Sequence, residues 1–137
     1  MPVTKILKLA FVMSVVIYGL VAFLVIGAPD WSKPWVPEAP GMAPLTYALT
    51  ALALAVWAVG FAFGRLQTPP AAFRAAQGPN PWPRMRFIMA AAFLEAGAIF
   101  GLVLAFVGRD SRPAILFAGV AAVLLLLLPT EEETKGP

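Results

Sequence analysis

One carboxyl group lies inside the long apolar stretches of this chain. Glu95 is the only charged residue in any of the four stretches, and it lies near the middle of the third. A carboxylate at the centre of a bilayer costs about 2.5–3.5 kcal/mol even on insertion scales that give the lowest values. Membrane proteins rarely carry such a group without a use. Glu95 is therefore the candidate site, and the chemistry it suggests is reversible binding of a proton or a sodium ion.

Neutral hydrogen-bonding side chains are expected at the depth of Glu95. Glu95 lies about nine residues, or roughly 13 Å, from one end of its helix. At the same depth are Ser14 and Tyr18 in the first stretch, and Thr50 and Trp57 in the second. With no Lys or Arg there, desolvation favours the protonated acid at neutral pH. Two hypotheses stay open: a neutral Glu95 that only hydrogen-bonds to Tyr18 or Ser14 between helices, or a site that binds and releases an ion.

The missing residue types exclude most catalytic chemistry. The chain has no His and no Cys, which removes imidazole bases, thiolate nucleophiles, disulfides, and the usual zinc, haem and iron–sulfur ligands. Ser14, Ser32 and Ser111 remain, but none has a base beside it in the sequence. We therefore expect no enzyme activity, no catalytic residue, no metal site and no cofactor.

The composition is that of a membrane protein. Of 137 residues, 61% are hydrophobic and only 12% are charged, which is too apolar for a water-soluble domain. About 20 apolar residues are needed for a helix to cross a bilayer. The uncharged runs predict a single all-α domain over residues 1–137, with transmembrane helices at about residues 9–28, 43–64, 87–108 and 113–128.

The basic residues are distributed unevenly between the two sides of this predicted bundle. One side, with the two termini and the second loop, has seven basic residues: Lys5, Lys8, Arg65, Arg74, Arg84, Arg86 and Lys135. The opposite side, with the first and third loops, has three: Lys33, Arg109 and Arg112. Since cytoplasmic loops carry the excess of Lys and Arg, we expect both termini in the cytoplasm and the helices in a bacterial inner (plasma) membrane. This topology accounts for the net charge of +3, so no nucleic-acid partner is expected.

The first loop, residues 30–41, contains three prolines and two tryptophans. Tryptophans just beyond a span usually anchor it at the membrane interface, and this is the role we expect for Trp31 and Trp35. A surface that docks a partner is the alternative.

Small residues predict where the helices pack together, because helices in lipid associate through close backbone approach. One stripe at helical spacing runs down the second span: Ala48, Ala51, Ala55, Ala58 and Ala62. Two small-xxx-small pairs are Gly60 with Gly64, and Gly97 with Gly101. At about 100° per residue, Gly97 and Gly101 project more than roughly 100° away from Glu95. The glycines and the carboxyl group should therefore face different neighbours.

The third span also carries a family resemblance. Residues Glu95 to Val103 read Glu-Ala-Gly-Ala-Ile-Phe-Gly-Leu-Val. This resembles the outer helix of the ring-forming c subunit (proteolipid) of rotary ATP synthases, where an ion-carrying Glu precedes a run of the form Ala-x-Ala-Ile-Tyr-Gly-Leu-Val. The polar stretch Gln77 to Pro81 resembles the cytoplasmic loop of that family. The resemblance covers about residues 60–107 and implies that Glu95 binds the ion and that Asn80 and Pro81 form the cytoplasmic turn.

The chain departs from that family in the preceding helix. The family has a dense glycine repeat there, whereas this chain has alanines together with Trp57, Phe61 and Phe63. The resemblance implies a proteolipid-like membrane protein that works as a homo-oligomer or within a larger membrane complex. The alternative is a structural or accessory membrane subunit in which Glu95 stays neutral.

Overall fold

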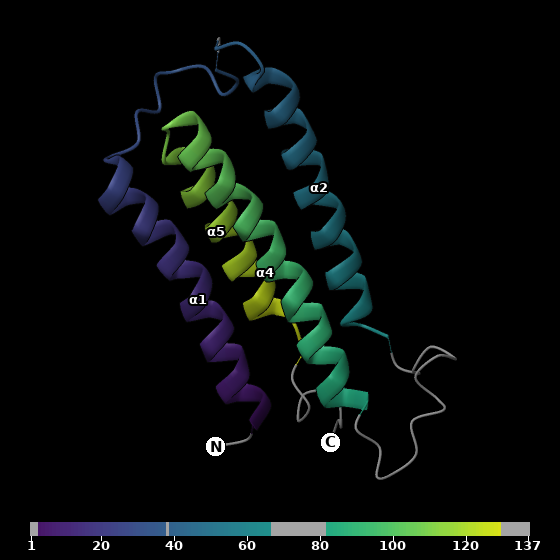
Figure 1. Cartoon of the computed structure of the whole chain (residues 1–137). Helices are drawn as coiled ribbons and strands as arrows, with labels where there is room; N and C mark the ends of the chain where they lie inside the picture. The colour runs from purple at the N-terminus through teal and green to yellow at the C-terminus, as the bar shows by residue number, and fades with distance from the viewer. Residues whose placement is uncertain (1–2, 38, 67–81, 130–137) are drawn as a thin grey trace.

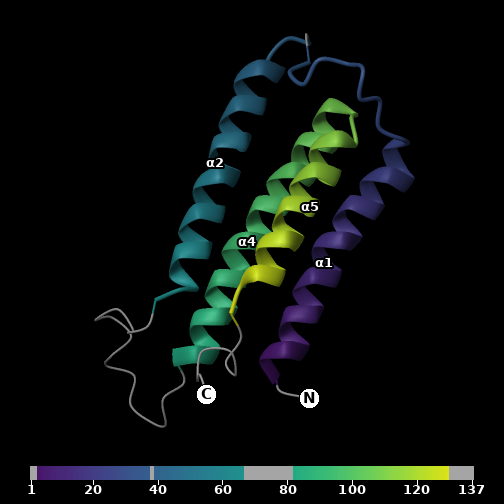
Figure 2. The ribbon, with the colours of Figure 1, turned by 180° about the vertical axis from the view of Figure 1, so that it is seen from behind.

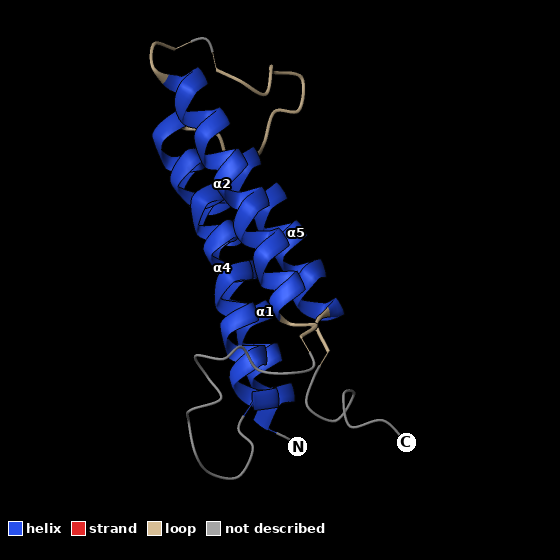
Figure 3. Cartoon of the chain, turned by 90° about the vertical axis from the view of Figure 1, so that its right-hand side faces the viewer, coloured by secondary structure: helices blue, strands red, loops and turns tan. Residues whose placement is uncertain are grey.

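The computed structural model describes residues 3–37, 39–66 and 82–129. These residues form α-helices joined by loops and contain no strand (Figure 3). The helices, labelled as in Figure 1, are α1 (Val3–Ile26), α2 (Met42–Phe63), α4 (Trp82–Gly108) and α5 (Arg112–Leu127). The prediction of an all-α chain is confirmed for this part of the sequence. Asn80 and Pro81, which the family resemblance places in a cytoplasmic turn, lie outside the described residues.

Three of the helices are long and apolar enough to cross a membrane: α1, α2 and the Arg84–Gly108 part of α4. The fourth, α5, has 16 residues and is about 24 Å long, which is shorter than a hydrocarbon core of about 30 Å. The bounds of α2 and α5 lie within one residue of the predicted spans. Helices α1 and α4 begin earlier than predicted, because they continue past the uncharged run through basic residues, which are good helix formers.

Helix α4 is the centre of the bundle. It packs against α1, α2 and α5, and α1 also packs along α5. Figures 1 and 2 show α1 and α2 on opposite sides of the α4–α5 pair, with the chain running up and down between the two ends. Any side chain of α4 therefore faces one of three different neighbours or the outside. Its direction around the helix axis decides which.

The predicted glycine pair of α2 lies at a close approach of helices. A Cβ atom added to Gly60 would lie 2.7 Å from Cβ of Phe93 in α4, which leaves no room for it. One added to Gly64 would overlap Cδ1 of Leu128, at the end of α5, and would lie 3.1 Å from Cβ of Ala90 in α4, which is a tight contact. Gly60 and Gly64 thus bring the backbone of α2 directly onto α4, as the packing of helices in lipid requires.

The alanine stripe of α2 does not pack against α4. Its members are all exposed, and they face away from α4: Ala48, Ala51, Ala55, Ala58 and Ala62. The buried face of α2 contains Met42, Thr46, Ala53, Trp57 and Gly60. The packing role predicted for the stripe is therefore not realised between the helices of this chain. The reason is that Trp57 and Gly60 match the surface of α4, and both lie on the face opposite the stripe.

Arg112 holds the α4–α5 turn to the first loop. Its side chain is 4% exposed. The guanidinium donates to Oδ2 of Asp110 from Nε at 2.8 Å and from Nη2 at 2.7 Å. It also donates to the carbonyl oxygens of Lys33 at 2.6 Å and Pro34 at 2.9 Å. One buried cation thus joins two segments almost eighty residues apart in the sequence.

Asp110 completes this contact. Burial alone would raise the pKa of its carboxyl group, but hydrogen bonds from the side chain and the backbone N–H of Arg112 outweigh burial, and the pKa lies below its usual value. Trp35 packs beside the pair, with its ring stacked on Phe117 at 6.4 Å and the Arg112 guanidinium 5.9 Å from its centre. Trp35 is thus half-buried, whereas Trp31 is exposed.

Candidate functional site

The Glu95 carboxyl group lies between α4 and α1. Its Oε1 atom accepts a hydrogen bond from Ser14 Oγ at 2.7 Å and another from Tyr18 OH at 2.5 Å. Ser14 and Tyr18 are four residues apart, so they lie on one face of α1. Their hydroxyl oxygens are 3.2 Å from each other. The three side chains form a small polar cluster, and two of the four residues predicted at this depth contribute to it.

The two carboxyl oxygens of Glu95 have different environments. Oε1 accepts both hydroxyl groups, whereas Oε2 has no hydrogen-bond partner among the described residues. Among the described residues, two side-chain polar atoms are fully enclosed without a hydrogen-bond partner, Thr4 Oγ1 and Thr50 Oγ1. Oε2 of Glu95 is not one of them. Glu95 itself is half-buried. One oxygen is therefore held in place from α1, and the other has no hydrogen-bond partner among the described residues and is not fully enclosed.

The other two predicted partners lie elsewhere. Trp57 of α2 donates from Nε1 to the backbone carbonyl of Leu94 at 3.1 Å, on the side of α4 that faces α2. Thr50, also in α2, has a buried hydroxyl without a partner among the described residues. Depth along the helix placed these residues level with Glu95, but it carried no information about which side of α4 they face. The Leu94 carbonyl was not anticipated, because a pattern of side chains does not reveal backbone acceptors.

The two glycines of α4 face neighbours other than α1. A Cβ atom at Gly97 would lie 2.5 Å from Cε2 of Trp57 in α2, and one at Gly101 would lie 2.6 Å from Cγ of Phe117 in α5. Glu95 faces α1. The expectation that the glycines and the carboxyl group project toward different neighbours agrees with this geometry. Three sides of α4 thus contact three different helices, and the carboxyl group lies on the side that contacts α1.

The cluster can hold a carboxyl group in either protonation state. A neutral acid accepts both hydroxyl protons on its carbonyl oxygen, and a carboxylate accepts the same two on one of its oxygens. The cluster has no cation that would bind the charged form permanently. Among the described residues, no group of three or more His, Cys, Asp or Glu side chains lies close enough to hold a metal ion. The arrangement therefore consists of one carboxyl group whose Oε1 accepts hydrogen bonds from two hydroxyl groups.

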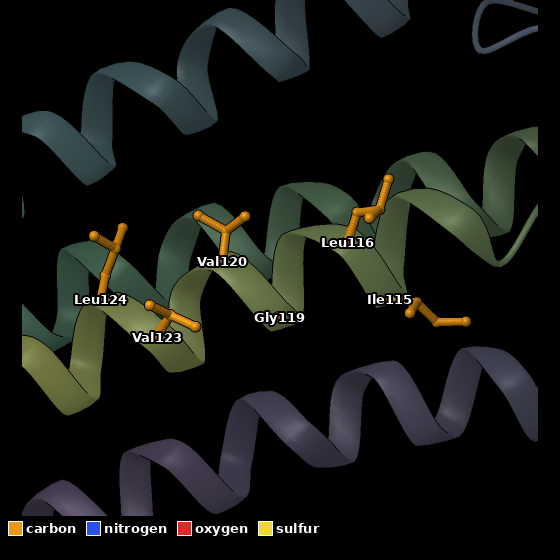
Figure 4. A pocket seen from close by; sticks show the side chains of 6 residues that line it. All are labelled: Ile115, Leu116, Gly119, Val120, Val123 and Leu124. Carbon is orange, nitrogen blue, oxygen red and sulfur yellow. The ribbon is translucent and has the colours of Figure 1, made fainter.

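A hollow lies on the outer face of α5 (Figure 4). It has a volume of about 440 Å³ and is lined only by aliphatic residues and one glycine: Ile115, Leu116, Gly119, Val120, Val123 and Leu124. Figure 4 shows these side chains pointing to both sides of α5, with Gly119 between them. Such a lining offers no group for acid–base or ligand chemistry. The polar cluster at Glu95 remains the candidate site.

Comparisons with protein-family models, with curated proteins and with solved structures find no match for this chain.

Removing one hydroxyl group tests how the cluster is held together. We expect Tyr18→Phe and Ser14→Ala each to destabilise the folded protein by about 1 kcal/mol, because each removes one hydrogen bond to Oε1. The double variant should lose more than the sum of the two, since Glu95 is then left without a donor. Unfolding in detergent with increasing SDS measures this. Full additivity would show that the two hydroxyl groups act independently of the carboxyl group.

Proposed function

We propose that this protein is an integral membrane protein that binds and releases a proton at Glu95. The observation that carries the proposal is the asymmetry of the carboxyl group: Ser14 and Tyr18 hold one oxygen, and the other has no hydrogen-bond partner among the described residues and is not fully enclosed. A proton needs only one free oxygen, whereas a sodium ion would need several further oxygen ligands around it.

The proposed topology has four membrane crossings with both termini in the cytoplasm. The excess of Lys and Arg at the end of the bundle where α1 begins supports this orientation. Helix α5 would cross together with α4, against which it packs, and flanking residues would make up for its short length. The likeness of residues 95–103 to the proteolipid c subunit supports a role within a homo-oligomer or a larger complex of a bacterial inner membrane.

Carbodiimide labelling tests the proposal directly. Dicyclohexylcarbodiimide reacts with protonated carboxyl groups in apolar surroundings, and we expect it to modify Glu95 in the full-length protein in mild detergent. Labelling should fall as the pH rises, because only the protonated acid reacts. Mass spectrometry of the peptide that contains Glu95 gives the labelled fraction at each pH. The carboxyl groups of Asp30 and Asp110, outside the helices, are internal controls with little labelling.

Glu95→Gln is the matched variant, because the amide keeps the size and the acceptor oxygen but cannot titrate. It should remove the pH-dependent label and leave the fold intact. An unlabelled Glu95 across the whole pH range, with a carboxylic acid added as a positive control reacting under the same conditions, would contradict the proposal. Protection by added sodium ions would instead assign the site to sodium.

The second candidate function is a structural or accessory subunit. It is favoured by the position of Ser14 and Tyr18, which attach α1 to α4 through hydrogen bonds to Glu95. In that case Glu95→Gln should behave like the native protein in every assay, including assembly with any partner. If Glu95→Gln assembles normally but no longer binds and releases a proton, the proton-binding function is supported.

A further inference from the structure

A small hollow with an excess of positive charge lies at the end of the bundle where α4 passes into α5. Its volume is about 270 Å³, and its lining includes Lys33, Pro37, Gly108, Arg109, Asp110 and Arg112. We propose that this hollow, called here the Arg109 pocket, binds the phosphate group of an anionic ligand. The proposal is independent of the function proposed for Glu95.

The charges in the lining do not cancel. Three cations, Lys33, Arg109 and Arg112, face one carboxylate, Asp110, which leaves a net charge of +2. Arg112 and Asp110 are paired with each other at 2.7 Å. Lys33 and Arg109 are exposed, and neither has a side-chain hydrogen bond or an ion pair among the described residues. Two unpaired cations at one hollow form an attractive site for an anion.

Asp30, a carboxylate of the first loop, has hydrogen-bond partners of its own. Asp30 accepts hydrogen bonds from the backbone N–H of Ser32 at 3.1 Å and from its hydroxyl group at 2.5 Å. Asp30 is not part of the lining. Hydrogen bonds from Ser32 lower the pKa of Asp30, with a smaller contribution from the charge of Lys33. Lys33 thus keeps its donors free for a ligand.

The backbone at Arg109 adds a second observation. Its φ of 51° makes Arg109 the one non-glycine residue with positive φ in the described chain. The N–H of Asp110 donates to the carbonyl of Ala105 at 3.0 Å, which is the hydrogen bond that ends a helix with a left-handed residue. Glycine is strongly favoured at such a position, because a side chain there is strained. An arginine at this position is consistent with a use for its guanidinium.

The chemistry of the pocket matches a phosphate group. A guanidinium binds two phosphate oxygens at once, and a lysine adds a point charge. The volume is smaller than that of typical sites for drug-sized ligands, so the pocket suits a single anionic group. It lies where the apolar helices end, beside the half-buried Trp35 and not far in sequence from Trp31. That is the depth of phospholipid headgroups, but free phosphate has the same chemistry.

The experiment uses the full-length protein in mild detergent. Native mass spectrometry measures how well phosphatidylglycerol and phosphatidylcholine are retained, and calorimetry measures binding of inorganic phosphate without lipid. The variant Arg109→Asn removes the charge with a residue that tolerates positive φ, and Lys33→Gln removes the second charge. Arg84→Gln is the matched control, because Arg84 is an exposed arginine near the start of α4, whereas Arg109 directly follows the end of the same helix.

We expect preferential retention of phosphatidylglycerol, weakened at least about tenfold in the double variant and unchanged in Arg84→Gln. Binding of inorganic phosphate with the same sensitivity to the variants would identify a site for free anions. Binding of the lipid alone would identify a headgroup site. Equal binding by the double variant and the native protein, or an equal loss in Arg84→Gln, would overturn the proposal. If the double variant fails to fold, Arg109→Asn alone decides between these results.

Discussion

Gly97→Ala should destabilise the folded protein by about 2–3 kcal/mol, although it adds only one methyl group. The new Cβ atom would lie within 2.5 Å of the indole of Trp57, which is 7% exposed and has its ring in edge contact with Phe117 at 5.3 Å. The indole cannot move aside without losing that contact and its hydrogen bond to the Leu94 carbonyl. The free energy of unfolding, measured with increasing SDS in mixed micelles, gives the result.

Gly119→Ala is the matched control for this substitution. It makes the same chemical change in α5, where an added Cβ atom would meet nothing within 4 Å. It should be neutral or slightly stabilising, because alanine is a better helix former than glycine. Combining Gly97→Ala with Trp57→Leu should recover part of the loss by making room. If the Gly97→Ala and Gly119→Ala variants have the same free energy of unfolding, the close approach of α2 and α4 at Gly97 does not contribute to stability.

Arg112→Met should have the second large effect, a loss of about 2–3 kcal/mol. Removing one partner of a buried ion pair costs about 3–5 kcal/mol. We expect less here, because the Asp110 side chain keeps 18% of its exposure and water can partly solvate it. The loss includes the hydrogen bonds to the carbonyls of Lys33 and Pro34, so the first loop should also become more accessible to proteases. Thermal unfolding in detergent and limited proteolysis measure the two effects.

The control for Arg112→Met is Arg109→Asn, which removes a positive charge from the same turn. Arg109 is exposed and has no side-chain partner among the described residues, so its loss should change stability by less than about 0.5 kcal/mol. Similar losses in the two variants would mean that the turn responds to total charge. In that case the individual hydrogen bonds of Arg112 would not explain its effect.

The pH dependence of stability provides a further check on the same ion pair. The pKa of Asp110 is lowered in the folded protein, so its contribution is complete above the ordinary aspartate pKa of about 3.9 and is lost as the pH falls through the lowered value. The native protein should therefore lose stability on acidification in this range. The stability of Arg112→Met should fall much less on acidification, because Asp110 in this variant has no arginine partner whose interaction protonation would remove. Parallel curves for the two proteins would contradict the assignment to Asp110.

Much of the fold follows from composition along the chain. The uncharged runs predicted helices whose bounds at α2 and α5 agree with the structure within one residue. The depth of Glu95 could also be derived, and it placed four polar side chains at the same level, of which Ser14 and Tyr18 bind Glu95. The spacing of four residues between these two placed both on one face of α1. These features depend on distance along a helix axis, which the number of residues determines directly.

The tertiary structure alone decided which helices are neighbours and which faces meet. Trp57 and Thr50 are level with Glu95 but lie in α2, on another side of α4, and the alanine stripe of α2 faces outward. In water, apolar periodicity marks the inner face of a helix. In lipid it does not, because the lipid-facing side is as apolar as the core. Depth could therefore be read from the sequence, whereas direction around each helix axis required the packed bundle.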